Sequence, residues 1–219
     1  MANGRTDRIS RRDLEVLEFV ARFGVVSREA IASWAGTAQT CTLARERRLR
    51  DGGLIDVRCG VWGEGKIAAS TRSGVVLCGR GELRPGRFSL ATVHHETAVS
   101  ELAAAMEHAG ERTLSEREIA AGEREQGKRI FSASLGEKRF HRADLLRVGA
   151  DGGPPEAIEV ELNAKGQARL DALLRAWRWA VGEKRLSRVV YRCPPRIRPV
   201  VERAVERTKT GAAVVVEEL

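Results

Sequence analysis

The sequence predicts two structural regions, an α+β region at the N-terminus and an α/β/α sandwich after it. Three observations predict this. Apolar residues recur at helical spacing in the first fifty residues, two extended runs flank a glycine-rich turn after them, and extended runs alternate with helical patterns in the second half. The 219 residues suit one large or two small domains, and the 42% apolar content is sufficient for a hydrophobic core.

Basic residues outnumber acidic ones, with 38 Lys and Arg against 30 Asp and Glu, a net charge of +8 and a pI near 9.9. Such a balance favours a polyanionic partner. The excess is uneven, because residues 1–90 hold 16 basic and 10 acidic residues whereas residues 91–219 hold 22 and 20. Contact with nucleic acid is therefore expected mostly in the first part of the chain.

The cysteines Cys41, Cys59, Cys78 and Cys193 lack the paired short spacing of a zinc motif. We expect reduced thiols in a cytoplasmic protein. The N-terminus is polar and charged, unlike a signal peptide, and no apolar run reaches the roughly 18 residues of a membrane span. A membrane partner is not expected.

Each of the first three predicted helices has recognisable ends. Serine favours the N-cap because its side chain accepts a hydrogen bond from a free backbone N–H, and glycine favours the end of a helix. The expected helices are residues 11–22, capped by Ser10 and ended by Gly24; residues 28–34, capped by Ser27 and ended by Gly36; and residues 40–51, ended by Gly52 and Gly53. A brief extended piece is expected at Val25–Val26, and two extended runs follow the third helix around a turn at residues 62–65.

Three helices followed by a two-stranded hairpin is the order of a winged helix-turn-helix. In that fold the third helix enters the major groove and the hairpin contacts the backbone or the minor groove. The stretch LRDGGLI, after an arginine-rich helix, closely resembles the same region of winged-helix regulators. The predicted DNA-binding side chains are Arg45, Arg47, Arg48, Arg50, Arg58, Trp62 and Lys66.

The third helix also has a feature that favours another use. Leu43 and Leu49 do not share a tight stripe, and Glu46 stands where a second leucine is usual. The alternative is therefore a winged helix that contacts protein instead of DNA.

Residues 80–90, which are rich in Gly, Arg and Pro, are expected to form a linker between domains at 1–79 and 91–219. A helix at 92–108 is expected to open the second domain. Strands joined by a crossover helix are expected to be parallel, which gives an α/β/α sandwich. The later extended runs are expected at 113–120, 129–135, 139–148, 156–162, 186–192 and 212–217, and the later helices at 167–181 and 195–208.

The stretch EAIEVELNAK, residues 156–165, is predicted to be a strand that runs towards a helix. Because side chains alternate along a strand, Glu159 and Glu161 share one face. Adjacent carboxylates repel each other unless a positive group lies near, and Mg²⁺ or Mn²⁺ would meet that need with Asp144 as a further oxygen ligand. The alternative is an exposed strand face whose acids pair with Arg or Lys.

Residues 92–193 resemble the core of the restriction-endonuclease-like fold, called PD-(D/E)xK. Asp144, in Arg142-Ala143-Asp144, stands where that family has the acid that closes its second core strand. Glu159-Val160-Glu161 stands at E-x-K, so the lysine that polarises the attacking water is replaced by Glu161, and Lys165 is the nearest lysine that can reach back. The resemblance implies a catalytic set of Asp144, Glu159, Glu161 and Lys165 with the metal on Asp144 and Glu159, or a degenerate domain kept for binding or dimerisation.

The whole layout also resembles a bacterial family, the replication-relaxation proteins, which combine a winged helix with a nuclease-like region and are associated with plasmids and other mobile elements. The residues that carry this match are RRDLEVLEFVARFGVVSREAIA, LRDGGLIDV, His95-(x)3-Val99, RADLL, IEVEL and RLDALLRAWRW. The resemblance implies a DNA-binding protein of a mobile element, nucleoid- or plasmid-associated and acting on duplex DNA as a homodimer. A metal-dependent endonuclease and a protein-interaction module are the alternatives.

Overall fold

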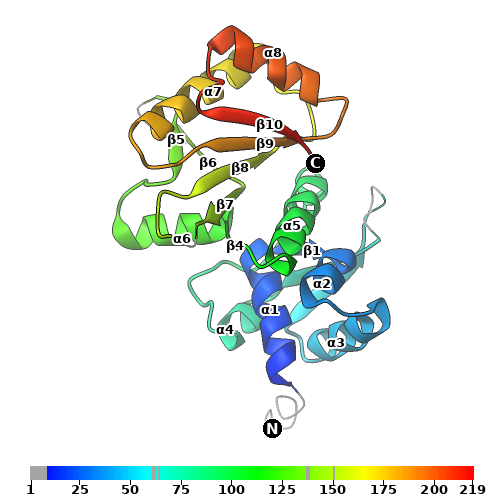
Figure 1. Ribbon diagram of the computed structural model, residues 1–219. Helices are drawn as coiled ribbons and strands as arrows, with labels where there is room; N and C mark the ends of the chain where they lie inside the picture. Colours follow the sequence, from blue (N-terminus) through cyan, green and yellow to red (C-terminus); the bar gives the residue numbers. More distant parts are fainter. Residues whose placement is uncertain (1–8, 61–62, 64, 137–138, 150) are drawn as a thin grey trace. The chain divides into compact units, whose positions relative to one another are not determined.

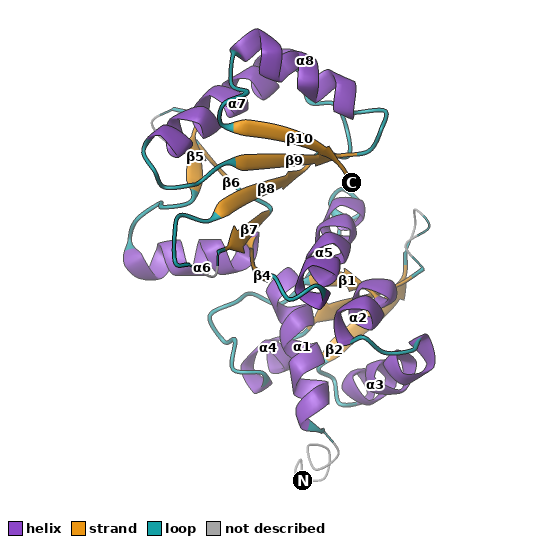
Figure 2. Cartoon of the chain, viewed as in Figure 1, coloured by secondary structure: helices purple, strands orange, loops and turns teal. Residues whose placement is uncertain are grey.

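Helices and strands both contribute to each of the two units into which the chain divides, so the molecule is of the α+β type (Figures 1 and 2). The computed structural model describes residues 9–60, 63, 65–136, 139–149 and 151–219. The first unit is Met1–Gly110 and the second is Glu111–Leu219.

The first unit places helices around a small antiparallel sheet with strand order β1-β3-β2. The strand between the first two helices pairs with the second strand of the hairpin, with Val26 opposite Ala68. Its elements are α1 (Arg11–Phe23), β1 (Val25–Ser27), α2 (Arg28–Ala35), α3 (Gln39–Asp51), β2 (Ile55–Cys59), β3 (Lys66–Ser70), α4 (Arg72–Leu77) and α5 (Val93–His108).

The predicted helix ends are confirmed by their hydrogen bonds. Ser10 and Asp13 form a capping box, in which each side chain accepts from the other residue's backbone N–H. The Ser27 side chain accepts from the backbone N–H of Ala30. Gly24 and Gly36 follow α1 and α2 with φ values of 81° and 59°, a region that favours glycine. Local sequence thus determines where the first two helices begin and end.

The predicted linker at residues 80–90 needs correction, because this segment packs on the first unit. Leu83 is buried. The backbone N–H of Gly86 donates to the Ser70 carbonyl at 2.8 Å. A Cβ on Gly86 would lie 2.0 Å from the Gly24 carbonyl oxygen, so only glycine allows this approach. A segment rich in Gly and Pro reads as flexible from its composition, but here the small residues permit close packing.

The predicted domain boundary also differs, because α5 belongs to the first unit and not to the second. Its side chains bond to α1, to Ser27 and to α2. Glu107 accepts from Trp34 Nε1 at 2.8 Å and pairs with Arg22 at 2.7 Å, and Glu101 accepts from Ser27 Oγ at 2.7 Å. The predicted division at 79 and 91 is therefore replaced by one between Gly110 and Glu111.

The second unit is built on a five-stranded mixed sheet with strand order β10-β9-β8-β7-β4. β8, β9 and β10 are parallel, as the crossover helices predicted, whereas β7 is antiparallel to both β8 and β4. β5 and β6 form a separate ribbon. The elements are β4 (Arg112–Ser115), α6 (Glu116–Gln126), β5 (Ser132–Ser134), β6 (Phe140–Arg142), β7 (Leu145–Val148), β8 (Glu156–Val160), α7 (Gln167–Gly182), β9 (Val189–Cys193), α8 (Arg198–Thr208) and β10 (Val214–Glu218).

Two of the predicted extended runs do not form single strands. One becomes a strand followed by a helix, and the other becomes two strands. The run at 113–120 ends after Ser115, because Ser115 forms a capping box with Glu118 and starts α6. The run at 139–148 breaks between β6 and β7, and Asp144 lies in that break. Asp144 therefore precedes the second strand of the sheet instead of closing it.

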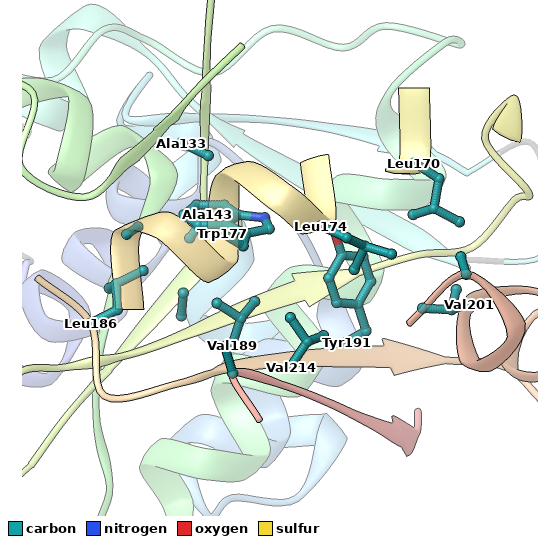
Figure 3. Close-up of a cluster of buried hydrophobic side chains, with 14 of the residues drawn as sticks. Ala133, Ala143, Leu170, Leu174, Trp177, Leu186, Val189, Tyr191, Val201 and Val214 are labelled. Atoms are coloured by element: carbon teal, nitrogen blue, oxygen red, sulfur yellow. The ribbon is translucent and has the colours of Figure 1, made fainter. Parts of the chain in front are cut away.

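The core of the second unit lies between one face of the sheet and the helices α7 and α8 (Figure 1). Figure 3 shows Trp177 and Leu174 of α7 against Val189 and Tyr191 of β9, with Val201 of α8 beside them. Trp177 and Tyr191 have no exposed surface. Ala157 of β8 belongs to this core, so Glu159 and Glu161, two and four residues later, also point towards α7.

Candidate functional site

The four predicted DNA-binding arginines of α3 fall into two groups. Arg47, Arg48 and Arg50 are exposed, and Arg50 pairs with its exposed neighbour Asp51 at 3.1 Å. Arg48 donates to both oxygens of the fully buried Asp13, at 2.8 and 3.2 Å, and Arg45 approaches Asp13 at 3.5 Å. Two arginines are thus engaged with α1, and two are available to an outside partner.

The acidic residue at the expected leucine position of α3 has a structural partner that sequence reasoning missed. Glu46 is buried and accepts two hydrogen bonds from the guanidinium of Arg28, at 2.7 and 2.8 Å. Arg28 begins α2, so this pair joins α2 to α3 where an apolar contact was expected. The weak apolar stripe of α3 therefore reflects an ion pair in its packing face. A buried Leu49 supplies the apolar anchor.

The hairpin carries two of the predicted side chains on exposed positions. Arg58 of β2 lies over the Phe88 ring at 4.7 Å, and Lys66 of β3 donates to Cys59 Sγ at 2.8 Å. Both side chains remain exposed. Trp62, also predicted to bind DNA, lies outside the described residues.

The four predicted catalytic residues gather at the C-terminal end of β8. Because β7 runs antiparallel to β8, with Leu145 opposite Ile158, the residue before β7 lies beside the end of β8. The backbone N–H of Val160 accordingly donates to Asp144 Oδ2 at 2.8 Å. Lys165 Nζ pairs with Glu161 Oε2. Sheet register therefore brings together acids that are separate in the sequence.

A histidine that sequence reasoning did not select completes this acidic cluster. His141 Nε2 lies 2.8 Å from Glu159 Oε2, and its ring contacts Trp177 edge-on with centroids 5.9 Å apart. His141 is three residues before Asp144, on β6. The sequence offered one indication of this role, which is that His141 directly precedes the Arg-Ala-Asp motif. Its contact with Glu159 at the end of β8 depends on how the β5–β6 ribbon folds.

Burial dominates the electrostatics of the cluster. It raises the pKa of Glu159, an effect that His141 opposes and Asp144 reinforces. Burial lowers the pKa of His141, but the charge and hydrogen bond of Glu159 outweigh it and the net pKa is raised. Burial, with Glu159 and Glu161 nearby, also raises the pKa of Tyr191 well above its usual range. The pKa of the Cys193 thiol rises to about 12, mainly through burial.

Two buried polar atoms of the cluster have no hydrogen-bond partner among the described residues, namely Glu159 Oε1 and Tyr191 Oη. The two residues are opposite each other in the parallel pair of β8 and β9. The predicted alternative of an exposed strand face is wrong, because β8 is buried throughout. That alternative also predicted that these acids pair with Arg or Lys, and this part holds for Glu161, which pairs with Lys165.

A metal on Asp144 and Glu159 would compete with bonds that are already formed. Asp144 Oδ2 and Glu159 Oε2 each hold a protein partner, which leaves one oxygen of Glu159 without one. Within the described ranges, no group of three or more His, Cys, Asp or Glu is arranged to hold a metal ion. Carboxylate oxygens are ligands that suit Mg²⁺ or Mn²⁺. In this structure, however, His141 pairs with Glu159 and Lys165 pairs with Glu161, so these side chains already offset the negative charge that such a cation would offset.

None of the helices in the described part of the chain has the length and apolar character of a membrane span. No family model matches the chain, and comparison with curated proteins and with solved structures gave no match.

Proposed function

We propose that the chain is a duplex-DNA-binding protein of a bacterial mobile element, similar to the replication-relaxation proteins, with its first unit acting as a winged helix. The element order α1-β1-α2-α3-β2-β3 and the sheet order β1-β3-β2 support this proposal. The observation that carries it is the division of the α3 arginines. Arg47 and Arg50 are exposed, while Arg45 and Arg48 pair with Asp13, although the Arg48 side chain is itself 40% exposed.

The proposed contact follows from the chemistry of these positions. An arginine-bearing third helix suits the major groove, where guanidinium groups bind phosphates and guanine edges. Arg58 is opposite Ile67 and Lys66 is opposite Cys59, so the two side chains occupy neighbouring positions of the hairpin but point to opposite faces of it. Each would meet the DNA backbone beside its own face. In this proposal Arg45 and Arg48 mainly fix the orientation of α3 against α1.

The salt dependence of binding to a labelled DNA duplex tests the proposal. Three to five neutralised phosphates give a log–log slope of about −3 to −5. The double variant Arg47→Ala, Arg50→Ala should flatten that slope by about two units, one for each phosphate that is no longer neutralised, with little change in melting temperature. Arg203→Ala, an exposed change on α8, is the matched control and should leave the slope unchanged. A slope unaltered in the double variant would remove α3 from the interface.

A second function, metal-dependent DNA cleavage, is favoured by the assembly of Asp144, Glu159, Glu161 and Lys165 at one strand end. Here Asp144 and Glu159 would hold the metal, and Lys165 or Glu161 would handle the water. Supercoiled plasmid incubated with Mg²⁺ or Mn²⁺ tests it. Nicking that disappears in Asp144→Asn and Glu159→Gln would establish the nuclease, whereas retention in a gel without nicking would leave DNA binding alone.

A further inference from the structure

The positive charge of the chain is concentrated outside the proposed winged helix as well. Between Lys165 and Arg198 there are ten Lys and Arg and two Asp and Glu, an excess of eight. The remaining residues hold 28 basic and 28 acidic side chains, so this stretch alone matches the net charge of the protein. The stretch consists of α7, β9 and the segments beside them. Four of these cations pair with acids that lie outside the stretch, namely Lys165 with Glu161, Arg188 with Glu156, Arg192 with Glu217 and Arg198 with Glu202. The excess that can favour a polyanion therefore lies on α7 and the segment directly after it.

The outer face of α7 is exposed, unlike its inner face. Residues at helical spacing line it, namely Ala168, Ala172, Arg175, Trp179 and Gly182, all of them exposed. The inner face, with Leu170, Leu174 and Trp177, is buried in the core shown in Figure 3. Two tryptophans two residues apart therefore have opposite roles. Trp177 has no exposed surface, whereas Trp179 is 55% exposed.

The exposed indole of Trp179 is held in place from one side. The Arg185 guanidinium lies over its ring at 5.0 Å from the centroid. Arg185 is itself fixed, because its Nη1 donates to the carbonyls of Ile130 and Ser132 at 2.9 and 3.1 Å, and its Nε donates to Glu183 at 2.9 Å. A ring covered on one face by a fixed cation leaves its other face for a planar partner.

Further cations flank the ring along the same helix and its end. Arg175 lies one turn before Trp179, Arg178 is adjacent to it and bonds the Lys209 carbonyl at 3.4 Å, and Lys184 follows the helix. Arg175 and Lys184 form no ion pair within 4.0 Å among the described residues. The nearest acids are already paired, Asp171 with Arg207 and Glu183 with Arg185. The outer face of α7 therefore presents an excess of positive charge beside an aromatic ring.

We propose that this outer face of α7 binds single-stranded DNA, with a base stacked on Trp179 and phosphates on Arg175, Arg178 and Lys184. Base–aromatic stacking beside a basic track is the chemistry of single-strand recognition. Duplex DNA does not fit, because its base faces are covered by neighbouring base pairs and an indole on a convex helix cannot reach between them. The site is separate from the duplex contact proposed for α3, since it lies in the other unit.

Fluorescence anisotropy with labelled oligo-dT and with a labelled duplex tests the proposal on the full chain. Trp179→Ala should weaken oligo-dT binding about tenfold, since one stacked base contributes about 1–3 kcal/mol, and should leave duplex affinity unchanged. Trp179→Phe retains a ring and should stay within about threefold of the unchanged protein. The exposed apolar residue Leu90, changed to Ala, is the control and should alter neither affinity.

Several outcomes would overturn the proposal. Oligo-dT affinity that is unchanged in Trp179→Ala, or equally reduced in Trp179→Phe and Trp179→Ala, would exclude stacking on this ring. A parallel loss of duplex affinity would make α7 part of the duplex interface instead. A change of sedimentation coefficient in Trp179→Ala would assign the face to contact between copies of the chain. Loss of duplex binding in the Arg47 and Arg50 variant, with oligo-dT binding kept, leaves this proposal standing and tests only the α3 interface.

Discussion

At the scale of single residues, the packing of both units depends on buried carboxylates that each face a basic side chain. Asp13 pairs with Arg48, Glu46 with Arg28 and Glu159 with His141. An ionised carboxylate loses solvation when it is buried, so its partner determines whether the site is tolerated. Removing one member of such a pair is therefore expected to lower the free energy of unfolding by more than the bond contributes to it, because the other member is left buried without a partner.

Asp13→Asn is expected to lower the free energy of unfolding by about 1–3 kcal/mol at neutral pH, because the cap is kept but the charged bonds to Arg48 are removed. Burial raises the pKa of Asp13, but the bonds from Arg48 and Ser10 outweigh it, and the net pKa is lowered. The stabilising effect is thus present above the unfolded pKa of about 3.9 and disappears as pH falls through the lowered value.

Urea unfolding at pH 7 and pH 3 measures this difference. The difference in free energy of unfolding between the unchanged protein and Asp13→Asn should be smaller at pH 3 than at pH 7. Glu15→Gln, which removes a half-exposed acid that pairs with Arg11 and Arg12 on the same helix, is the control and should have a much smaller effect at pH 7. A gap of equal size at both pH values would contradict the assignment to ionised Asp13.

His141→Ala is expected to create a response to Mn²⁺, because it frees Glu159 Oε2 beside Asp144. At a hundredfold excess over the dissociation constant, a bound ion would add about 2.7 kcal/mol to stability and raise the melting temperature. His141→Gln keeps a donor for Glu159 and should show a weaker response, and His141→Ala with Asp144→Asn should show none. An equal Mn²⁺ response in the unchanged protein would mean that His141 does not compete with the ion.

At the scale of elements, the segment after α4 packs on the first unit at Leu83 and Gly86, although most of its residues are exposed. Gly86→Ala would force a Cβ against the Gly24 carbonyl and should destabilise the first unit by about 1–3 kcal/mol, as overpacking does. Gly81→Ala is the matched control, because a Cβ at Gly81 meets nothing within 4 Å. Thermal unfolding followed by circular dichroism compares the two. Equal melting temperatures of Gly86→Ala and Gly81→Ala would indicate that residues 80–90 are a flexible linker, as the sequence predicted.

At the scale of the whole molecule, the place of α5 determines which fragments can fold. A fragment of residues 1–110 contains the partners of α2 and β1 described above and should unfold cooperatively and retain duplex affinity. A fragment of residues 1–90 lacks Glu101 and Glu107, so Ser27, Trp34 and Arg22 lose the bonds that they form with α5. We expect it to unfold without a sharp transition. Equal cooperativity of the two fragments would contradict this role of α5.

The sequence predicted local features well, since Ser10, Gly24, Ser27 and Gly36 act through hydrogen bonds and backbone angles within a few residues. It also predicted the parallel strands around the crossover helices. What it could not supply depends on contacts between distant segments. The pairing of Glu46 with Arg28, of Glu159 with His141 and of α5 with the first unit needs tertiary structure. The composition of residues 80–90 predicted a flexible linker, whereas Gly86 in this segment allows close packing against Gly24.

The order of strands in the second unit has a consequence for synthesis on the ribosome. The first unit is complete in sequence at Gly110, whereas β9 and β10 of the second sheet are separated from β8 by long helices. Sheets that depend on such distant pairings fold slowly, and domains tend to fold in the order in which they emerge. The first unit can therefore acquire its fold while the second still waits for β10. Slow codons placed between them would lengthen that interval.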